Sequence, residues 1–240
     1  MHAGVMYRSN DVPAADPAGT SHDPPDPAAA SARHAPQDQS TVESLWDQRY
    51  ADREHLWSGK PNATLVTEAR GLRAGRALDV GCGEGADALW LAEHGWDVTA
   101  LDVSQVALDR AVLQAEVLGA RVRWLHSGLI EAALPPASFD LVSAQYPALL
   151  RTDDNAAEFA LLNAVAPGGV LLIVHHPVPR TEEASAHGFD PHDYVSPATV
   201  AALLDDRWRI EVNETRPRHL TAGAGAHHTE DIVVRARRLR

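Results

Sequence analysis

One stretch constrains the fold more than any other part of this 240-residue chain: RALDVGCGEGADALWLAEHGWDVTALD, from Arg76 to Asp102. Its first apolar run ends at three closely spaced glycines, Gly81, Gly83 and Gly85, which predicts a buried strand followed by a tight turn. Apolar residues then recur on one helical face, and a second apolar run ends at Asp102. The pattern predicts a strand, a helix and a second strand with a right-handed crossover, so the two strands should be parallel.

The glycine turn indicates a site for an anionic or nucleoside-bearing small molecule. Glycine lets the backbone approach a ligand closely, and the following helix presents unpaired N–H groups and a positive dipole end. Asp102, at the end of the next strand, is suited to accept hydrogen bonds from both hydroxyls of a ribose. The spacing alone leaves two cofactor classes open, because Gly81, Gly83 and Ala86 also satisfy the G-x-G-x-x-G/A pattern of nicotinamide and flavin enzymes.

Three details favour S-adenosylmethionine. The string LDVGCGEG resembles the first motif of class I methyltransferases, and VTALDVS resembles that family's next motif, whose acid binds the ribose. Lys60 is the single lysine, so the Tyr-x-x-x-Lys pair of short-chain dehydrogenases is absent. The resemblance implies an S-adenosylmethionine site formed by Asp79, Gly81, Cys82, Gly83, Gly85, Asp102 and Val103.

An aromatic segment, LWDQRYADREHLWSGKPNATLV, precedes the glycine motif. Its form, W-D-x-R-Y followed by W-x-G-x-P-N, resembles the tellurite-resistance and thiopurine methyltransferase group, in which the N-terminal segment closes over the methionine end of the cofactor. The resemblance implies that Trp46, Tyr50 and Trp57 flank the cofactor, within a helical lid of about residues 40–72. The alternative is an aromatic cluster that only fastens a helix to the sheet.

The remaining pattern predicts an α/β fold. Further strands are expected at 121–125, 139–144, 170–174, 208–213 and 231–236. Asp153 or Asp154 is expected to cap the helix before the run at 170–174. The resemblance implies a Rossmann-like, seven-stranded, mostly parallel sheet of order 3-2-1-4-5-7-6, with strand 7 antiparallel and helices on both faces.

Polar residues follow two strands at the edge where open parallel sheets bind ligands. Gln145 and Tyr146 come after the fourth strand, and Gln145 is expected to lie at the cofactor. His175 and His176 come after the fifth strand and, with Tyr146, are the candidates for a catalytic base. The alternative for the two histidines is a hydrogen bond to a loop carbonyl for one of them and exposure to solvent for the other.

The end of the third strand is where this fold places the adenine ring. The family often has an acid there, but this chain reads Ser127, Gly128, Leu129. We therefore expect backbone groups of Gly128 and Leu129 to contact the adenine. The long loop from Pro177 to Ser196, with His187, Asp190, His192 and Tyr194, is expected to be a second functional lid.

Composition bounds the rest of the molecule. Residues 1–39 hold many prolines and alanines and few large apolar residues, so we expect a disordered extension followed by one domain over 40–240. The formal charge of -12 argues against a nucleic-acid partner. The chain lacks a long apolar run and an apolar signal-peptide core, which predicts no membrane contact and a cytoplasmic protein. The oligomeric state is open.

The sequence predicts a methyltransferase that acts on a small-molecule acceptor. The resemblance suggests a thiol or a chalcogen oxyanion, since such soft acceptors need little more than a pocket. Two alternatives remain, a nicotinamide-dependent oxidoreductase and a non-catalytic S-adenosylmethionine-binding protein. The thirteen histidines are scattered without ligand spacing, so no metal is expected.

Overall fold

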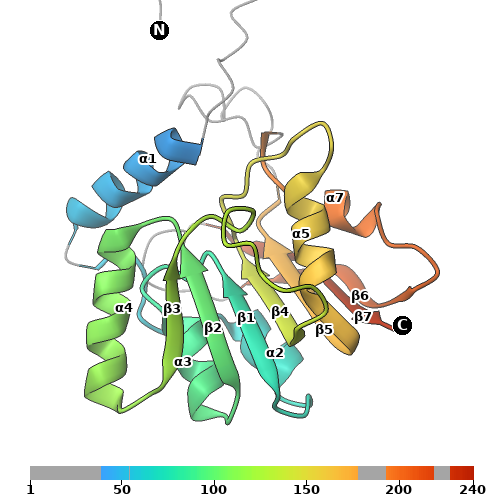
Figure 1. The fold of residues 1–240 in the computed structure, drawn as a ribbon, viewed down its shortest axis with the longest axis horizontal. Coiled ribbons are helices and arrows are strands. Elements are labelled where there is room, and N and C mark those ends of the chain that lie inside the picture. The colour runs from blue at the N-terminus through green and yellow to red at the C-terminus, as the bar shows by residue number, and fades with distance from the viewer. Residues whose placement is uncertain (1–38, 54, 178–192, 219–227) are drawn as a thin grey trace, which may run out of the picture. The chain divides into compact units, whose positions relative to one another are not determined.

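A computed structural model of the chain describes residues 39–53, 55–177, 193–218 and 228–240 (Figure 1). The expected disorder of residues 1–39 falls almost wholly outside these ranges. Of the long loop before Ser196, His187, Asp190 and His192 lie outside the described residues as well, so its role as a lid stays a prediction.

The strands form one seven-stranded sheet of order β3-β2-β1-β4-β5-β7-β6, in which β7 runs antiparallel to β5 and β6 (Figure 1). The strands are β1 (Arg76–Val80), β2 (Asp97–Asp102), β3 (Val122–His126), β4 (Phe139–Gln145), β5 (Val165–His175), β6 (Trp208–Pro217) and β7 (Glu230–Arg238). This order and the antiparallel seventh strand confirm the predicted fold class.

Helices cover both faces of the sheet. They are α1 (Gln39–Ala51), α2 (Ala63–Ala69), α3 (Ala86–Glu93), α4 (Gln105–Leu118), α5 (Ala156–Ala164) and α7 (Pro197–Ala201). Leu161 of α5 and Val200 of α7 are fully buried in one core cluster, together with Leu78 and Val80 of β1. Leu65 of α2 and residues of α3 are buried in another cluster, which packs on the opposite face of the same strands. The alternation along β1 therefore places its side chains in two separate layers.

The ends of two helices agree with their sequence signals. The Ser104 hydroxyl accepts a hydrogen bond from Ala107 N at 3.2 Å and so caps α4, and Gly119 ends that helix in the left-handed conformation. Ser196 and Thr199 form a reciprocal capping box at the start of α7.

Two local predictions need correction. The residue at the cap position of α5 is Asn155, with a φ of 54° and no side-chain bond to the helix. The predicted Asp154 nevertheless accepts the first helix N–H, from Ala156, at 3.2 Å, and Thr152 Oγ1 accepts it at 3.0 Å. Strand β5 begins at Val165, five residues before the predicted start of 170. Gly168, with a φ of 81°, and Gly169 lie inside β5, near a shift in the register between β5 and β4. These two glycines therefore mark an irregularity within the strand and do not form a turn before it.

The parallel pairing brings the carboxyl ends of the central strands level. Val80 is paired with Leu101 of β2 and with Ala144 of β4. Figure 1 shows α1 beyond this edge, and its Asp47 accepts a 2.6 Å hydrogen bond from Ser104 at the start of α4. The segment predicted to be a lid therefore starts beside the edge at which the site residues gather.

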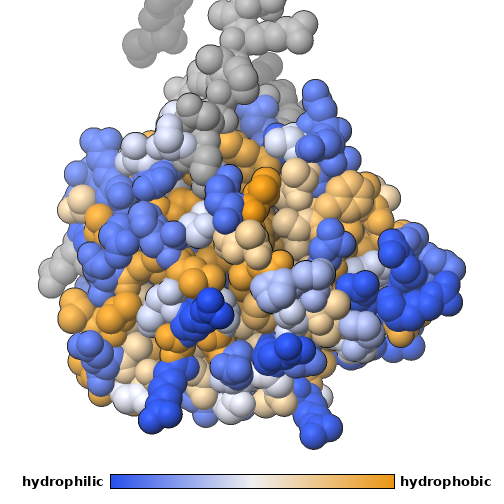
Figure 2. Space-filling view, in the orientation of Figure 1, coloured by the Kyte–Doolittle hydropathy of each residue, from blue (hydrophilic) through white to orange (hydrophobic). Residues whose placement is uncertain are grey.

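The face in view in Figure 2 carries interspersed polar and apolar side chains. Leu113, Val117 and Leu118 of α4 are exposed apolar residues of the molecule. No helix in the described ranges is long and apolar enough to cross a membrane.

Candidate active site

A cavity of about 420 Å³ opens at the carboxyl edge of the sheet, bounded by the glycine turn, the lid segment and the residues after β4 and β5. It gathers most of the residues predicted from the sequence: Trp46, Tyr50, Trp57, Asp79, Gly81, Cys82, Gly83, Asp102, Val103, Gly128, Leu129, Gln145, Tyr146 and His176. Two predicted site residues, Gly85 and His175, do not line it.

Gly85 has a structural role instead. It precedes α3 with a φ of 83°, and a Cβ at this position would come within 2.8 Å of both Ala111 and Trp124. The absence of a side chain therefore lets α3 start in close contact with α4 and β3.

Asp102 is fixed against the glycine turn by two backbone hydrogen bonds. Gly83 N donates to its Oδ2 at 2.7 Å, and Ser104 N donates to its Oδ1 at 2.9 Å. Only 7% of the residue is exposed, and burial raises the pKa of its carboxyl, although these N–H groups oppose the shift. A carboxylate oxygen can accept more than one hydrogen bond, so both oxygens can still bind ligand hydroxyls.

Asp79 presents an unsatisfied oxygen to the same cavity. The residue is 2% exposed, and its Oδ2 has no hydrogen-bond partner within the described ranges. Burial, with the negative charges of Asp87 and Asp102 beside it, raises the pKa of this carboxyl well above its usual range. A positively charged or N–H-donating ligand group would satisfy the orphaned oxygen and relieve the repulsion.

The lid packs directly on the glycine turn. Trp57 Nε1 donates to Tyr50 Oη at 2.8 Å, and a Cβ on Gly83 would stand 2.7 Å from that hydroxyl oxygen. Trp46 completes the aromatic cluster, with its ring centroid 6.0 Å from that of Tyr50 and 6.4 Å from that of Trp57. The three aromatic residues thus line the cavity together, and their contact with a cofactor stays a prediction.

Glu84, inside the glycine turn, fastens the lid. Its carboxylate accepts hydrogen bonds from Leu56 N at 3.4 Å, Trp57 N at 3.2 Å and Arg110 Nη1 at 2.9 Å. Arg110 in turn donates to the carbonyl of Tyr50 at 2.8 Å. Neither Glu84 nor Arg110 was predicted as a site residue, since the glycine motif leaves the position of Glu84 unspecified.

Asp87 makes a second connection to the lid. It accepts from Asn62 N at 2.7 Å and from Asn62 Nδ2 at 2.8 Å. Asn62 stands at the cap of α2, and its side chain bonds Asp87 in place of the helix. The start of α2 is thereby tied to the start of α3.

A polar cluster forms the other end of the cavity. The Tyr146 hydroxyl donates to Asp231 Oδ1 at 2.8 Å, and the Thr64 hydroxyl donates to Asp231 Oδ2 at 3.2 Å. Arg218 Nε lies 3.5 Å and His176 Nδ1 lies 3.7 Å from Asp231 Oδ1. Of these residues the sequence predicted only Tyr146 and His176.

The charges of this polar cluster are balanced within the protein. Burial alone would raise the pKa of Asp231, but His176, Tyr146, Arg218 and Thr64 together hold it below its ordinary value. Burial, together with the charge of Asp231, raises the pKa of Tyr146. The tyrosine therefore stays protonated and the aspartate ionised near neutral pH.

Asp231 could have been predicted as a site residue from the direction of its strand in the sheet. Strand β7 is antiparallel, so its amino end lies at the same edge as the carboxyl ends of its parallel neighbours, and Ile232 pairs with His175. A polar residue at the start of β7 is thus equivalent to one at the end of β5.

His175 lies behind the site. Its Nδ1 is 3.3 Å from the carbonyl oxygen of His176, and burial lowers its pKa. His175 therefore fits the alternative role considered from the sequence, in which one histidine bonds a carbonyl and takes no part in catalysis. Among the predicted bases, only His176 and Tyr146 reach the cavity.

Cys82 lies in the cavity wall as a buried thiol. Burial raises the pKa of the Cys82 thiol well above its usual range, so it packs as a neutral residue. Within the described ranges no three His, Cys, Asp or Glu side chains come together as a metal site.

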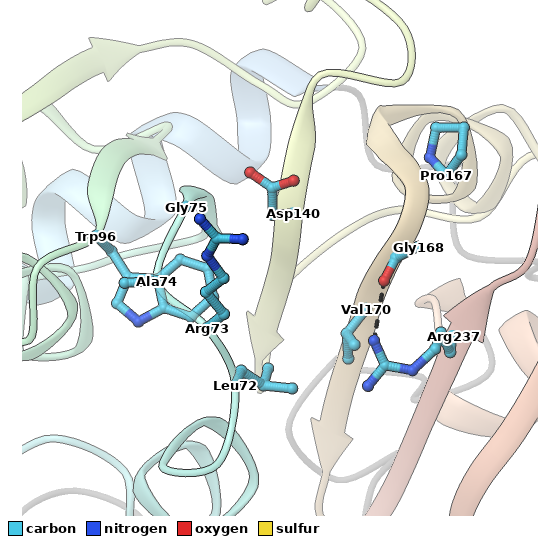
Figure 3. A pocket seen from close by; sticks show the side chains of 10 residues that line it. All are labelled: Leu72, Arg73, Ala74, Gly75, Trp96, Asp140, Pro167, Gly168, Val170 and Arg237. Atoms are coloured by element: carbon cyan, nitrogen blue, oxygen red, sulfur yellow. Dashed lines mark hydrogen bonds between the residues drawn. The ribbon is translucent and has the colours of Figure 1, made fainter.

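A second hollow of about 440 Å³ lies at the opposite, amino edge of the sheet (Figure 3). Arg73, Trp96, Asp140 and Arg237 contribute side chains to it. Arg237 donates a hydrogen bond to the carbonyl of Gly168 at 2.9 Å and forms an ion pair with Glu211, so its charge is already compensated. Because parallel sheets bind ligands at the carboxyl edge, the first cavity is the candidate active site.

Comparison with known proteins agrees with this geometry. Residues 77–169 match the family described as a methyltransferase domain. An uncharacterised methyltransferase of Mycobacterium tuberculosis is 38% identical over 111 residues, which are 46% of this chain and 55% of the relative. The chain thus spans about half the length of that relative.

Two solved structures extend the likeness beyond the matched segment. The first belongs to a study of the conversion of a disulfide bond into a thioacetal group during echinomycin biosynthesis. It is 25% identical in sequence, its TM-score is 0.66, and the alignment covers 82% of this chain and 92% of that chain. The other is the N-methyltransferase NodS of Bradyrhizobium japonicum in complex with S-adenosyl-L-homocysteine, with 18% identity and a TM-score of 0.62, covering 82% and 99%. The latter likeness concerns the fold alone.

Proposed function

We propose that this chain, whose residues 77–169 match a methyltransferase domain, is an S-adenosylmethionine-dependent enzyme that transfers a methyl group to a small-molecule acceptor. The observation that carries the proposal is the pair of buried carboxyls at the glycine turn, Asp79 with an orphaned oxygen and Asp102 with both oxygens held by backbone N–H groups.

The residues present fit the cofactor. Asp102 would hold the ribose hydroxyls, Asp79 would face the positively charged methionine end, and Gly128 and Leu129 would contact the adenine. Trp46, Tyr50 and Trp57 would cover it. Bound S-adenosylmethionine supplies an activated methyl group on its sulfonium, so the protein has only to orient the acceptor and exclude water.

The charge of the cavity wall favours this cofactor over a nicotinamide dinucleotide. Five carboxyl groups line the cavity, against one lysine and one arginine: Asp79, Glu84, Asp87, Asp102 and Asp231, with Lys60 and Arg218. A diphosphate at the turn would lie against Asp79, Glu84 and Asp87. A cationic sulfonium suits the same surface, because opposite charges attract more strongly where water is excluded.

The charged residues that line the cavity also affect which kind of acceptor can enter it. At the acceptor end the charge of Arg218 is already matched by Asp231 at 3.5 Å, so this part of the wall offers an oxyanion no excess positive charge and admits a neutral thiol. The likeness to a structure concerned with disulfide chemistry supports a sulfur nucleophile. We therefore propose a neutral sulfur compound as the first acceptor to test; membership of the tellurite and thiopurine group stays a prediction.

Calorimetric titration of the purified full-length chain tests the cofactor. S-adenosylmethionine and S-adenosylhomocysteine should bind with micromolar affinity, and reduced nicotinamide cofactors should not. Binding of a nicotinamide in their place would refute the proposal. Binding of the adenosyl compounds with no methyl transfer to a wide panel of thiols, alcohols and amines would favour a non-catalytic binding protein.

A further inference from the structure

The His176 ring is held rigidly at the acceptor end of the cavity. It stacks on Tyr146 with a centroid distance of 4.3 Å and an interplanar angle of 22°. It also stacks on His228 at 3.8 Å and 15°. Two close stacking neighbours fix the plane of the imidazole, so its chemistry is directed through the ring edges.

Asp231 faces one of those edges. Its Oδ1 is 3.7 Å from His176 Nδ1, and this nitrogen is buried with no hydrogen-bond partner among the described residues. The separation is longer than a hydrogen bond, but catalytic hydrogen bonds are often long before the substrate is bound. A carboxylate beside Nδ1 favours the tautomer with the proton on that nitrogen, which leaves Nε2 as a proton acceptor.

Asp231 is itself held in place. Hydrogen bonds from Tyr146 and Thr64 occupy one position on each of its oxygens, and Arg218 provides a nearby positive charge. These contacts come from α2, the residue after β4 and the residue after β6, so the carboxylate is fixed from three directions. Tyr146 is not available as a base, because its hydroxyl proton is donated to Asp231.

We propose that His176 Nε2 removes the proton from a protic acceptor and that Asp231 is the positioning residue that sets the tautomer of His176. This inference rests on the proposed function and deepens it. The acceptor is then a neutral thiol or hydroxyl compound and not a preformed anion, which would need no base.

The methyl transfer is a nucleophilic displacement at the methyl carbon. The S–H or O–H bond of the acceptor breaks and its proton passes to Nε2. The electron pair left on the acceptor atom forms the new bond to the methyl carbon, while the electrons of the old carbon–sulfur bond stay on the cofactor sulfur. The histidine then releases the proton to solvent.

The tautomer can be measured without turnover. Nitrogen NMR of the full chain with isotope-labelled histidine, assigned through the spectrum of His176→Gln, should show neutral His176 protonated on Nδ1 in the absence of ligands. Asp231→Asn presents an amide in place of the carboxylate and should shift the population towards protonation on Nε2. A wild-type His176 protonated on Nε2 would overturn the inference.

Kinetics with a verified acceptor supply the second test. His176→Gln should lower kcat by at least about 100-fold, and Asp231→Asn by at least about 10-fold, with the affinity for S-adenosylmethionine retained. The matched control is His94→Gln, since His94 is an exposed residue at the end of α3 that bonds Trp90 O. Asp231→Glu, which keeps the charge, should restore part of the activity and guards against a folding defect.

The outcomes separate the two proposals. A wild-type chain that binds no adenosyl cofactor refutes the proposed function. A wild-type chain that methylates an acceptor, with His176→Gln at full turnover, refutes only this inference. Equal rates for wild type and His176→Gln on an acceptor that is already an anion, with a large loss on the neutral thiol or alcohol, would support it.

Discussion

Alanine at position 83 tests whether the lid rests on the cofactor turn. Gly83 has a φ of 53°, which costs an L residue about 1–2 kcal/mol. The new Cβ would also stand 2.7 Å from Tyr50 Oη, an overlap of the kind that costs about 1–3 kcal/mol in a packed core. Gly83→Ala should therefore lower the free energy of unfolding by about 2–5 kcal/mol.

Gly81→Ala is the matched control. Gly81 has a φ of 70°, and the nearest atom to its Cβ would be Cα of Pro147 at 3.7 Å, an ordinary contact. This variant should lose only the conformational part, about 1–2 kcal/mol. Both values are measured by urea unfolding of the ligand-free chain.

Tyr50→Phe completes a double-mutant cycle. It removes the hydroxyl that the new methyl group would meet, along with the hydrogen bond from Trp57, which is worth about 0.5–1.5 kcal/mol. Gly83→Ala should cost about 1–3 kcal/mol less in the Tyr50→Phe background than in the wild type. Equal losses at the two glycines together with strictly additive effects would show that Tyr50 does not pack on the turn.

Three further predictions concern the acidic groups of the site. Asp102→Asn should weaken S-adenosylmethionine binding about 10- to 100-fold by calorimetry, because a hydrogen bond to a charged group is lost. The raised pKa of Asp79 means that its ionisation opposes folding, so the stability advantage of Asp79→Asn over wild type should be absent below about pH 4. Above that pH it should grow by up to about 1.4 kcal/mol per pH unit and then level off once the pH passes the raised pKa of Asp79 in the folded chain, as followed by denaturation at several pH values; a constant difference throughout would contradict the shift. Glu84→Gln and Arg110→Ala should each increase protease cleavage of the lid at a fixed enzyme ratio, whereas unchanged cleavage would mean that these contacts do not restrain it.

The parts of the fold that were predictable are those encoded locally. The glycine turn and Asp102 belong to one strand, helix, strand unit, and Ser104 caps α4 through Ala107, three residues further on, so each pattern is contiguous in the chain. The order of the sheet came from the resemblance to a family. The start of α5 was predictable only in part, because Thr152 and Asp154 both accept the N–H of Ala156 and the sequence does not rank two such oxygens.

The acceptor end was only half predictable for a physical reason. Tyr146 and Asp231 are 85 residues apart, and Thr64 and Asp231 are 167 apart. No periodicity or spacing rule connects side chains over such separations; only the pairing of β7 between β5 and β6 brings them together. Glu84 illustrates the same limit at shorter range, since its partners depend on the path of the lid.

The two ends of the cavity differ in how their carboxyl groups are compensated. Asp79 and Asp102 have raised pKa values because burial outweighs the hydrogen bonds that the protein gives them, whereas Asp231 has a lowered pKa because donors surround it. The first pair therefore gains from a cationic ligand, and binding there should stabilise the fold by about 2.7 kcal/mol at a ligand concentration a hundred times Kd. Asp231 has no such deficit for a ligand to fill. A carboxylate already satisfied by the protein is suited to orienting His176, and one left unsatisfied is suited to binding the cofactor.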